Sequence, residues 1–142
     1  MAEKRTPALL IEDNRYCPGC GHGIINRVLA EVLEEMGLAE EAVISLAVGC
    51  GGLMMYSFGT DWIQAPHGRA AAVATGFKRV RPKNCVIAYQ GDGDALAIGG
   101  NHFIHAARRN IKLTAIVMNN RIYGMTGGQY SPLSGIGVSA TT

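Results

Sequence analysis

The chain has 142 residues, which is enough for one domain with a sizeable hydrophobic core. Only 17% of the residues are charged and the net charge is +2, so a nucleic-acid binder that relies on bulk positive charge is excluded. No apolar run reaches the roughly 18 residues of a membrane-spanning helix, and the N-terminus lacks a signal-peptide pattern. We therefore expect a cytoplasmic protein that binds neither nucleic acid nor membrane.

Apolar periodicity and glycine positions predict the elements of the first third of the chain. Residues 1–15 carry no period and are interpreted as an N-terminal lead-in, followed by one domain over 16–142. Apolar residues over 24–36 recur at helical spacing, and Gly37 provides a natural stop for that helix. The apolar run 43–48 then predicts a short buried strand, which ends at a glycine-rich stretch.

The remaining pattern predicts a helix over 68–80, a strand over 85–90, a helix over about 95–109 and a strand over 113–119. Strands that are apolar on both faces and alternate with helices are typical of an α/β fold, with a parallel sheet flanked by helices. From Arg121 onward the sequence lacks a period and is rich in Gly, Ser and Thr. We expect a loop there, and we expect the domain to continue beyond this chain.

Glycine-rich and polar stretches follow each predicted strand: GCGG after the first, GDGD after the second and NNRIYG after the third. Ligands of open parallel sheets bind at the carboxyl ends of the strands. Asp92 lies there between two glycines, whose backbone N–H groups can approach an anion at the start of a helix. A carboxylate beside a phosphate site is typical of Mg²⁺ binding, and Asn120 follows the next strand. Taken alone, GDG is more typical of a turn with Asp92 capping the helix, but the Asn pair after the next strand reverses this preference in favour of the metal site.

The cysteines leave several interpretations open. Cys17 and Cys20, in CPGCGHG, precede a helix, so they fit a redox pair, half a zinc site or ligands of an iron–sulfur cluster. Cys50 lies at the mouth of the first strand, whereas Cys85 opens a buried strand and is interpreted as a core residue. The pair His102 and His105 has a spacing that suits a metal, but helix packing is the favoured interpretation because no third ligand is evident.

Four motifs together resemble one known family. CPGCGHG, HGRA, GDGDALAIGGNHFIHAARRN and NNRIYGMTGGQYSP are similar to the β subunit of 2-oxoacid:ferredoxin oxidoreductases, which bind thiamine diphosphate. The amino-acid sequence of the third motif is most similar to that of the 2-oxoglutarate type. The resemblance covers about residues 16–132. It implies the thiamine diphosphate-binding fold and a partner α subunit that supplies the rest of the active site.

The resemblance also implies roles for individual residues. Asp92, Asn120 and the backbone carbonyl of Ile122 match the family's Mg²⁺ ligands, and Cys17, Cys20 and Cys50 match three ligands of a [4Fe–4S] cluster. The family's fourth cysteine lies further along the β subunit than this chain extends. The positions that match thiamine diphosphate contacts are Val48, Gly49, Cys50, His67, Gly68, Arg69, Gly91, Gly93, Asp94, Gly124 and Met125.

The implied reaction is oxidative decarboxylation of a 2-oxoacid, with 2-oxoglutarate the closest match, to acyl-CoA and CO₂, or the reverse. Electrons would pass through the cluster to ferredoxin. No catalytic residue is assigned in this chain, because the family's activating glutamate comes from the α subunit. Two alternatives remain: an iron-free thiamine diphosphate-dependent decarboxylase or synthase subunit, and a non-enzymatic metal or electron-transfer module built on the cysteines.

Overall fold

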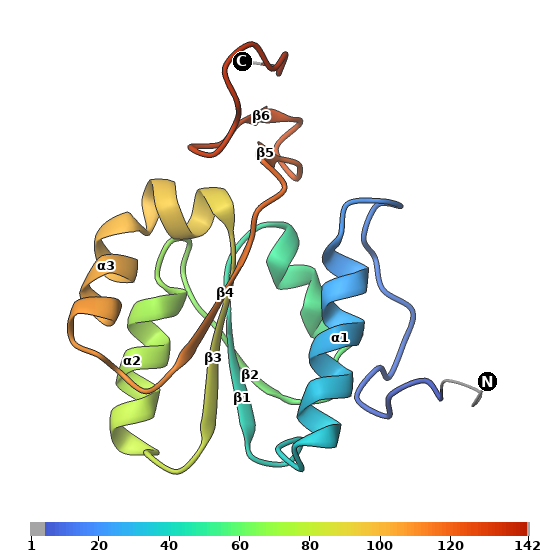
Figure 1. Ribbon diagram of the computed structural model, residues 1–142, viewed down its shortest axis with the longest axis vertical. Coiled ribbons are helices and arrows are strands. Elements are labelled where there is room, and N and C mark those ends of the chain that lie inside the picture. The colour runs from blue at the N-terminus through green and yellow to red at the C-terminus, as the bar shows by residue number, and fades with distance from the viewer. Residues whose placement is uncertain (1–4, 142) are drawn as a thin grey trace.

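A four-stranded parallel sheet with the order β2-β1-β3-β4 forms the centre of the computed structural model (Figure 1). The structure describes residues 5–141, so residues 1–4 of the predicted lead-in and Thr142 lie outside the described residues. The predicted α/β fold with a parallel sheet flanked by helices is confirmed. The sheet consists of β1 (Ala42–Leu46), β2 (Asp61–Gln64), β3 (Cys85–Gly91) and β4 (Thr114–Met118), and the α-helices are α1 (His22–Glu35), α2 (Ala70–Val80) and α3 (Gly100–Arg108).

Helices cover both faces of the sheet, α1 on one side and α2 with α3 on the other (Figure 1). Successive side chains of a strand point to opposite faces, so each buried strand serves two cores. On the α1 face, Ile87 and Tyr89 join the cluster that contains Leu33. On the α2 face, Val86 and Ala88 pack against Ala74. This two-sided burial explains why the strands are apolar throughout.

The edge strand β2 and the 3₁₀-helix η1 (Cys50–Tyr56) were not predicted from the sequence. β2 pairs in parallel with β1, from Val43 opposite Asp61 to Leu46 opposite Gln64. Its four residues DWIQ are mostly exposed, as an edge strand permits, and they show no apolar alternation. A strand this short and polar leaves no periodic signal, so only the pairing with β1 identifies it.

The helix predicted over 95–109 is wrong as a single element. A π-helix, η2 (Gly93–Ile98), is followed by α3. The interruption lies at Gly99, where an added Cβ would be only 2.3 Å from the Asp94 carbonyl oxygen and 2.8 Å from the Gly68 carbonyl oxygen. The chain therefore changes its helical geometry where the turn after β2 packs closely against it.

The predicted loop after Arg121 contains a small antiparallel hairpin, β5 (Ile122–Tyr123) and β6 (Gln129–Tyr130). Gly127 and Gly128 connect its strands with φ values of 109° and 99°, which only glycine adopts readily. The hairpin lies beyond the carboxyl end of β4 (Figure 1). The hairpin therefore lies at the edge of the sheet where the sequence predicted the ligand site.

The described part of the N-terminal lead-in contains neither helix nor strand, yet it is packed on the domain. Leu9 is buried in the α1-side core, and its backbone N–H donates to Glu34 Oε1 over 2.9 Å. Leu10 forms an isolated antiparallel bridge with Phe58. Within residues 5–141, no helix is long and apolar enough to cross a membrane.

A buried polar chain connects the sheet, α1 and the loop that carries CPGC. The Tyr89 hydroxyl donates to Asn26 Oδ1 over 2.7 Å, and Asn26 Nδ2 donates to the Tyr16 hydroxyl oxygen over 3.3 Å. Burial raises the pKa of Tyr16 to about 12 and raises the pKa of Tyr89 further. The Tyr16 ring stacks on His22 at a centroid distance of 4.8 Å, so the CPGC loop is anchored by the residue that precedes Cys17.

We expect Tyr89→Phe to lower the free energy of unfolding by about 1–3 kcal/mol, because Asn26 Oδ1 loses its donor in the interior. Chemical denaturation followed by circular dichroism measures the change. Tyr56→Phe is the matched control, since the Tyr56 side chain is 44% exposed, and a change within about 0.5 kcal/mol is expected there. Equal stability of the two variants would contradict the importance of the buried chain.

Candidate cofactor site at the carboxyl ends of the strands

One pocket lies at the carboxyl ends of β1, β3 and β4, at the edge where the sequence predicted a ligand site. It collects residues from three separate sequence motifs, as the fold returns each strand end to the same edge. The predicted residues that line it are Val48, Gly49, Cys50, His67, Gly91, Asp92, Gly93, Asp94, Asn120, Ile122, Gly124 and Met125. Gly68, Arg69, Cys17 and Cys20 are not among its lining residues.

Asp92 joins the end of β3 to the segment that follows β4. Asp92 is 2% exposed. Oδ1 accepts from the backbone N–H of Gly93 over 2.8 Å, and Oδ2 accepts from the Arg121 N–H over 2.8 Å and from Ser131 Oγ over 2.7 Å. These bonds bring Asn120 and Ile122, which flank Arg121, into the pocket beside the carboxylate.

The oxygen atoms collected here fit a divalent cation. Asp92 offers a carboxylate, Asn120 an amide oxygen and Ile122 a backbone carbonyl, which are the hard ligands that Mg²⁺ prefers. Asn120 Oδ1 accepts a bond from the Ile122 N–H over 3.3 Å, so the amide and this part of the backbone are already held together. The residues present therefore suit the predicted magnesium site.

Gly93 allows the hairpin to approach the end of β3. A Cβ added at Gly93 would be 2.1 Å from Cε1 of the Tyr123 ring, a distance that no side chain tolerates. Tyr123 belongs to β5 and lines the same pocket. The glycine in GDGD is thus required for the packing of the hairpin against the strand end, in addition to any contact with a ligand.

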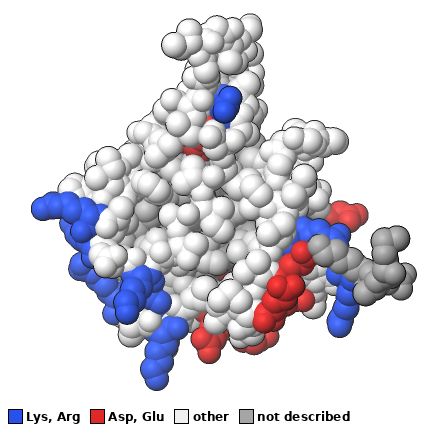
Figure 2. All heavy atoms as spheres, in the orientation of Figure 1, with Lys and Arg blue, Asp and Glu red and all other residues white. Residues whose placement is uncertain are grey.

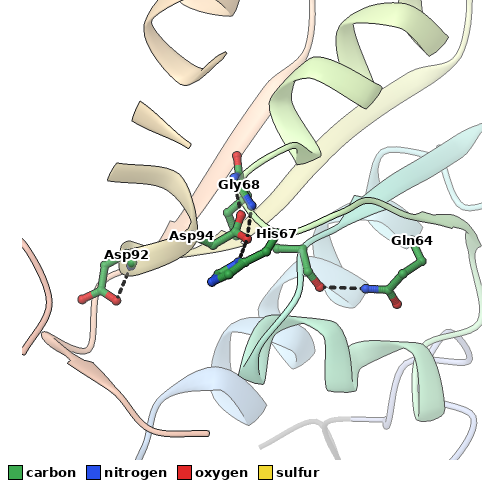
Figure 3. A network of polar contacts seen from close by, with 8 residues as sticks. Gln64, His67, Gly68, Asp92 and Asp94 are labelled. Atoms are coloured by element: carbon green, nitrogen blue, oxygen red, sulfur yellow. Dashed lines mark hydrogen bonds and ion pairs between the residues drawn. The ribbon is translucent and has the colours of Figure 1, made fainter. Parts of the chain in front are cut away.

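Asp94, the second carboxylate of GDGD, is held by three donors (Figure 3). Its Oδ1 is 2.5 Å from His67 Nδ1 and accepts from the Gly68 N–H over 2.7 Å, while Oδ2 accepts from Gln90 Nε2 over 2.5 Å. The Asp94 side chain is 2% exposed, whereas that of His67 is 44% exposed. The buried carboxylate therefore connects the end of β3 to the turn after β2.

The cysteines lie at two ends of the domain. All four are free thiols, and Cys50 lines the pocket, whereas Cys85 begins β3 at the opposite end of the sheet and packs against the core, as predicted. Burial raises the pKa of Cys50, and the nearby side chains of Cys17 and Cys20 raise it further. The CPGC loop lies near the pocket, because His22, two residues after Cys20, lines it, although residues 5–141 form no group of three or more His, Cys, Asp or Glu side chains with the arrangement of a metal site.

His22 was missed as a site residue. It begins α1, lines the pocket and is 2% exposed. Neither of its ring nitrogens has a hydrogen-bond partner of normal geometry among residues 5–141, and burial lowers its pKa. The sequence signal was its place in CPGCGHG, directly after the cysteines, which were interpreted without it. The favoured interpretation of His102 and His105 as packing residues stays a prediction, since both lie on α3, outside this pocket.

The charge of the pocket is unusual for an anion site. Its ionisable lining residues, within the described chain, are two carboxylates, two histidines, one thiol and one phenol, with neither Lys nor Arg. Figure 2 shows charged side chains gathered on the lower part of this face, while the upper part, around the hairpin, is almost entirely uncharged. A phosphate group bound here would therefore depend on a cation held by the carboxylates.

The family of the C-terminal TPP binding domain of thiamine pyrophosphate enzymes matches residues 47–142. The chain belongs to this family. The matched region begins directly after β1 and contains everything that follows, including all pocket residues other than His22. The thiamine diphosphate-binding fold that the motifs implied is confirmed.

Curated relatives extend the similarity to the CPGC region. The chain is 47% identical over 128 residues to 2-oxoglutarate synthase subunit KorB of Methanocaldococcus jannaschii, an alignment that covers 89% of this chain and 47% of that protein. It is 46% identical over 127 residues to 2-oxoglutarate oxidoreductase subunit KorB of Mycobacterium tuberculosis, with 89% and 34% covered. Ketoisovalerate oxidoreductase subunit VorA of Methanothermobacter thermautotrophicus is 46% identical, with 89% and 27% covered. The chain thus spans about half, or less, of the length of these relatives.

A solved structure has the same fold. The 2-oxoglutarate:ferredoxin oxidoreductase from Magnetococcus marinus, with 2-oxoglutarate, coenzyme A and succinyl-CoA bound, superposes with a TM-score of 0.89 at 38% sequence identity. The superposition covers 97% of this chain and 48% of that one. The resemblance to 2-oxoacid:ferredoxin oxidoreductase β subunits, predicted from four motifs, is therefore confirmed.

Proposed function

We propose that this chain is the thiamine diphosphate-binding part of the β subunit of a 2-oxoacid:ferredoxin oxidoreductase that acts on 2-oxoglutarate. The observation that carries the proposal is the pocket, in which the motifs shared with that family meet at one strand edge. The 47% identity to a 2-oxoglutarate synthase subunit supports the choice of substrate class. The relatives that act on ketoisovalerate make a branched 2-oxoacid the second candidate substrate.

Different residues of the pocket would bind different parts of the cofactor. Asp92, Asn120 and the Ile122 carbonyl hold Mg²⁺, which offsets the absence of Lys and Arg from the described residues that line the pocket. Gly91, Gly93 and the start of η2 would contact the phosphate groups. Val48, Gly49 and Met125 would contact the rest of the cofactor. Once bound, thiamine diphosphate supplies the electron sink that makes loss of CO₂ from a 2-oxoacid feasible.

The thiols supply three of the four ligands that a [4Fe–4S] cluster normally takes, Cys17, Cys20 and Cys50. Cys50 belongs both to the pocket and to this thiol group, so it would bring the cluster next to the cofactor. Cys85 is too far along β3 to act as the fourth ligand, because it begins the strand whose other end forms the pocket. We therefore assign the fourth ligand to a part of the complex outside this chain.

A partner subunit is part of the proposal. Thiamine diphosphate enzymes need a carboxylic acid beside the aminopyrimidine ring, and no glutamate is among the described residues that line the pocket. The two aspartates already accept three hydrogen bonds each from this chain. The activating carboxylate would come from an α subunit that covers the open side of the pocket.

The test is an assay of the full-length protein purified with its partner subunit under anaerobic conditions. We expect ferredoxin to be reduced only when 2-oxoglutarate and coenzyme A are both supplied, with pyruvate and 2-oxoisovalerate as competing substrates. Thiamine, magnesium, iron and sulfide are measured per complex. Activity without iron would support an iron-free decarboxylase or synthase instead. Iron without bound thiamine would support a non-enzymatic electron-transfer module.

A further inference from the structure

His22 is a buried histidine to which neither the proposed magnesium site nor the proposed cluster gives a role. It is 2% exposed, and neither ring nitrogen has a hydrogen-bond partner of normal geometry in the described chain. Polar atoms that are buried without a partner destabilise the folded state, so native proteins pair almost all of them. The His22 ring nevertheless lines the cofactor pocket. We therefore expect its partner to be a molecule that enters this pocket.

The His22 ring is held in a fixed orientation. The Tyr16 ring stacks on it with a centroid distance of 4.8 Å and an angle of 24° between the ring planes. The Tyr16 hydroxyl oxygen accepts a hydrogen bond from Asn26 Nδ2 over 3.3 Å, which fixes the stacking partner in turn. Burial lowers the pKa of His22, whereas the Cys20 backbone and the Asp92 carboxylate raise it. The ring therefore lies near both the CPGC loop and the proposed magnesium ligand.

The N-terminus of α1 adds a positive partial charge at the same place. This helix of 14 residues begins at the edge of the sheet that carries the pocket (Figure 1). Among the described residues, α1 has neither an acidic side chain in its first turn nor a side-chain cap. The N–H groups at the start of a helix attract anions. His22 adds a side-chain donor beside them, since an imidazole ring carries at least one N–H in each tautomer and when protonated.

An anion in the pocket needs such a donor. The lining contains the carboxylates of Asp92 and Asp94 and, among its described residues, neither Lys nor Arg. The backbone N–H of Gly93 already donates to Asp92, and that of Gly68 already donates to Asp94. The His22 ring is thus a buried donor in this pocket that no other described residue uses.

We propose that His22, together with the N-terminus of α1, binds an anionic oxygen of the ligand in the pocket through a hydrogen bond that its ring donates. This rests on the proposed function. Two ligand groups have the required chemistry: the diphosphate of the cofactor and a carboxylate of the 2-oxoacid. The hydrogen bond satisfies a ring nitrogen that the described chain leaves unpaired.

The test compares variants at position 22 that keep or remove the donor. His22→Phe keeps an aromatic ring to stack on Tyr16 and removes both nitrogens, whereas His22→Gln retains an amide N–H near the outer end of the ring. His22→Leu takes the place of His22→Phe if the latter does not fold. His105→Gln, exposed on α3 and outside this pocket, is the matched control. Each variant is made in the full-length chain and purified with its partner subunit.

Two calorimetric titrations separate the sources. The first gives the Kd of thiamine diphosphate with Mg²⁺, and of inorganic pyrophosphate with Mg²⁺ as a probe that lacks the thiamine part. The second gives the Kd of glutarate, an unreactive analogue with both carboxylates of 2-oxoglutarate, for the cofactor-loaded complex. If the diphosphate accepts the bond, His22→Phe raises the Kd of both diphosphates about tenfold. If a carboxylate accepts it, only the glutarate Kd rises, again about tenfold.

In either case His22→Gln retains more of the wild-type affinity than His22→Phe. Without ligands, His22→Phe should unfold at the same temperature as the wild type or a higher one, since an unpaired polar ring is removed from the interior. Wild-type Kd values of His22→Phe in both titrations would overturn the proposal, as would equal loss of affinity in His22→Gln and His22→Phe. Absence of turnover in the wild-type complex would reject the proposed function alone, because neither titration requires turnover.

Discussion

The Asp92→Ala variant is expected to lose Mg²⁺-dependent binding of thiamine diphosphate by about 100-fold or more. Asp92 is the only carboxylate in the proposed magnesium ligand set, and the pocket has no Lys or Arg among its described lining residues to replace the lost cation. Calorimetric titration of the full-length protein with the cofactor, at several Mg²⁺ concentrations, measures the effect. The wild-type Kd should depend on Mg²⁺ and the variant's should not.

Asp92 also has a structural role that the controls must separate from metal binding. Its Oδ2 accepts from the Arg121 N–H and from Ser131 Oγ, so its removal loosens the segment that carries Asn120. Ser131→Ala removes one of these bonds and leaves the carboxylate, and it should bind the cofactor within about threefold of wild type. Tight, Mg²⁺-dependent binding by Asp92→Ala would contradict the assigned ligand set.

The sequence predicted those parts of the fold whose burial leaves a periodic pattern. The strands β1, β3 and β4 and the helices α1 and α2 were predicted to within about two residues, because each packs a continuous apolar face. The edge strand β2 was missed because its residues face solvent, and the break at Gly99 was missed because it depends on a contact with Gly68. Both omissions concern structure that is set by packing between distant segments.

The candidate site, like the fold, was predicted from the sequence only in part. Asp92 and Asn120 were predicted together because the carboxyl ends of neighbouring parallel strands must meet, which is a rule of topology. The family resemblance implied that Asp94 contacts thiamine diphosphate, but its hydrogen bonds with His67 and Gly68 depend on the turn after the unpredicted β2. That contact has no signature in the sequence. Only the folded chain brings the HGR turn onto the end of β3.

Cys50→Ala is expected to lower the iron content of the purified complex and to slow ferredoxin reduction by about 100-fold or more, because a [4Fe–4S] cluster depends on its thiolate ligands. The side chain is small, so replacement by alanine disturbs the packing little. Iron and sulfide analysis and the visible iron–sulfur absorption measure the cluster, and 2-oxoglutarate-dependent ferredoxin reduction measures its function.

Cys85→Ala is the matched control. Burial raises the pKa of both Cys50 and Cys85, so intrinsic reactivity does not separate the two thiols, whereas position does. Cys85 pairs with Ala42 at the beginning of the parallel strands and packs against the core, while Cys50 lies at their carboxyl ends in the pocket. Cys85→Ala should therefore retain its iron. Equal iron in both variants would remove Cys50 from the cluster and favour the iron-free enzyme, in which Cys50 only lines the cofactor pocket.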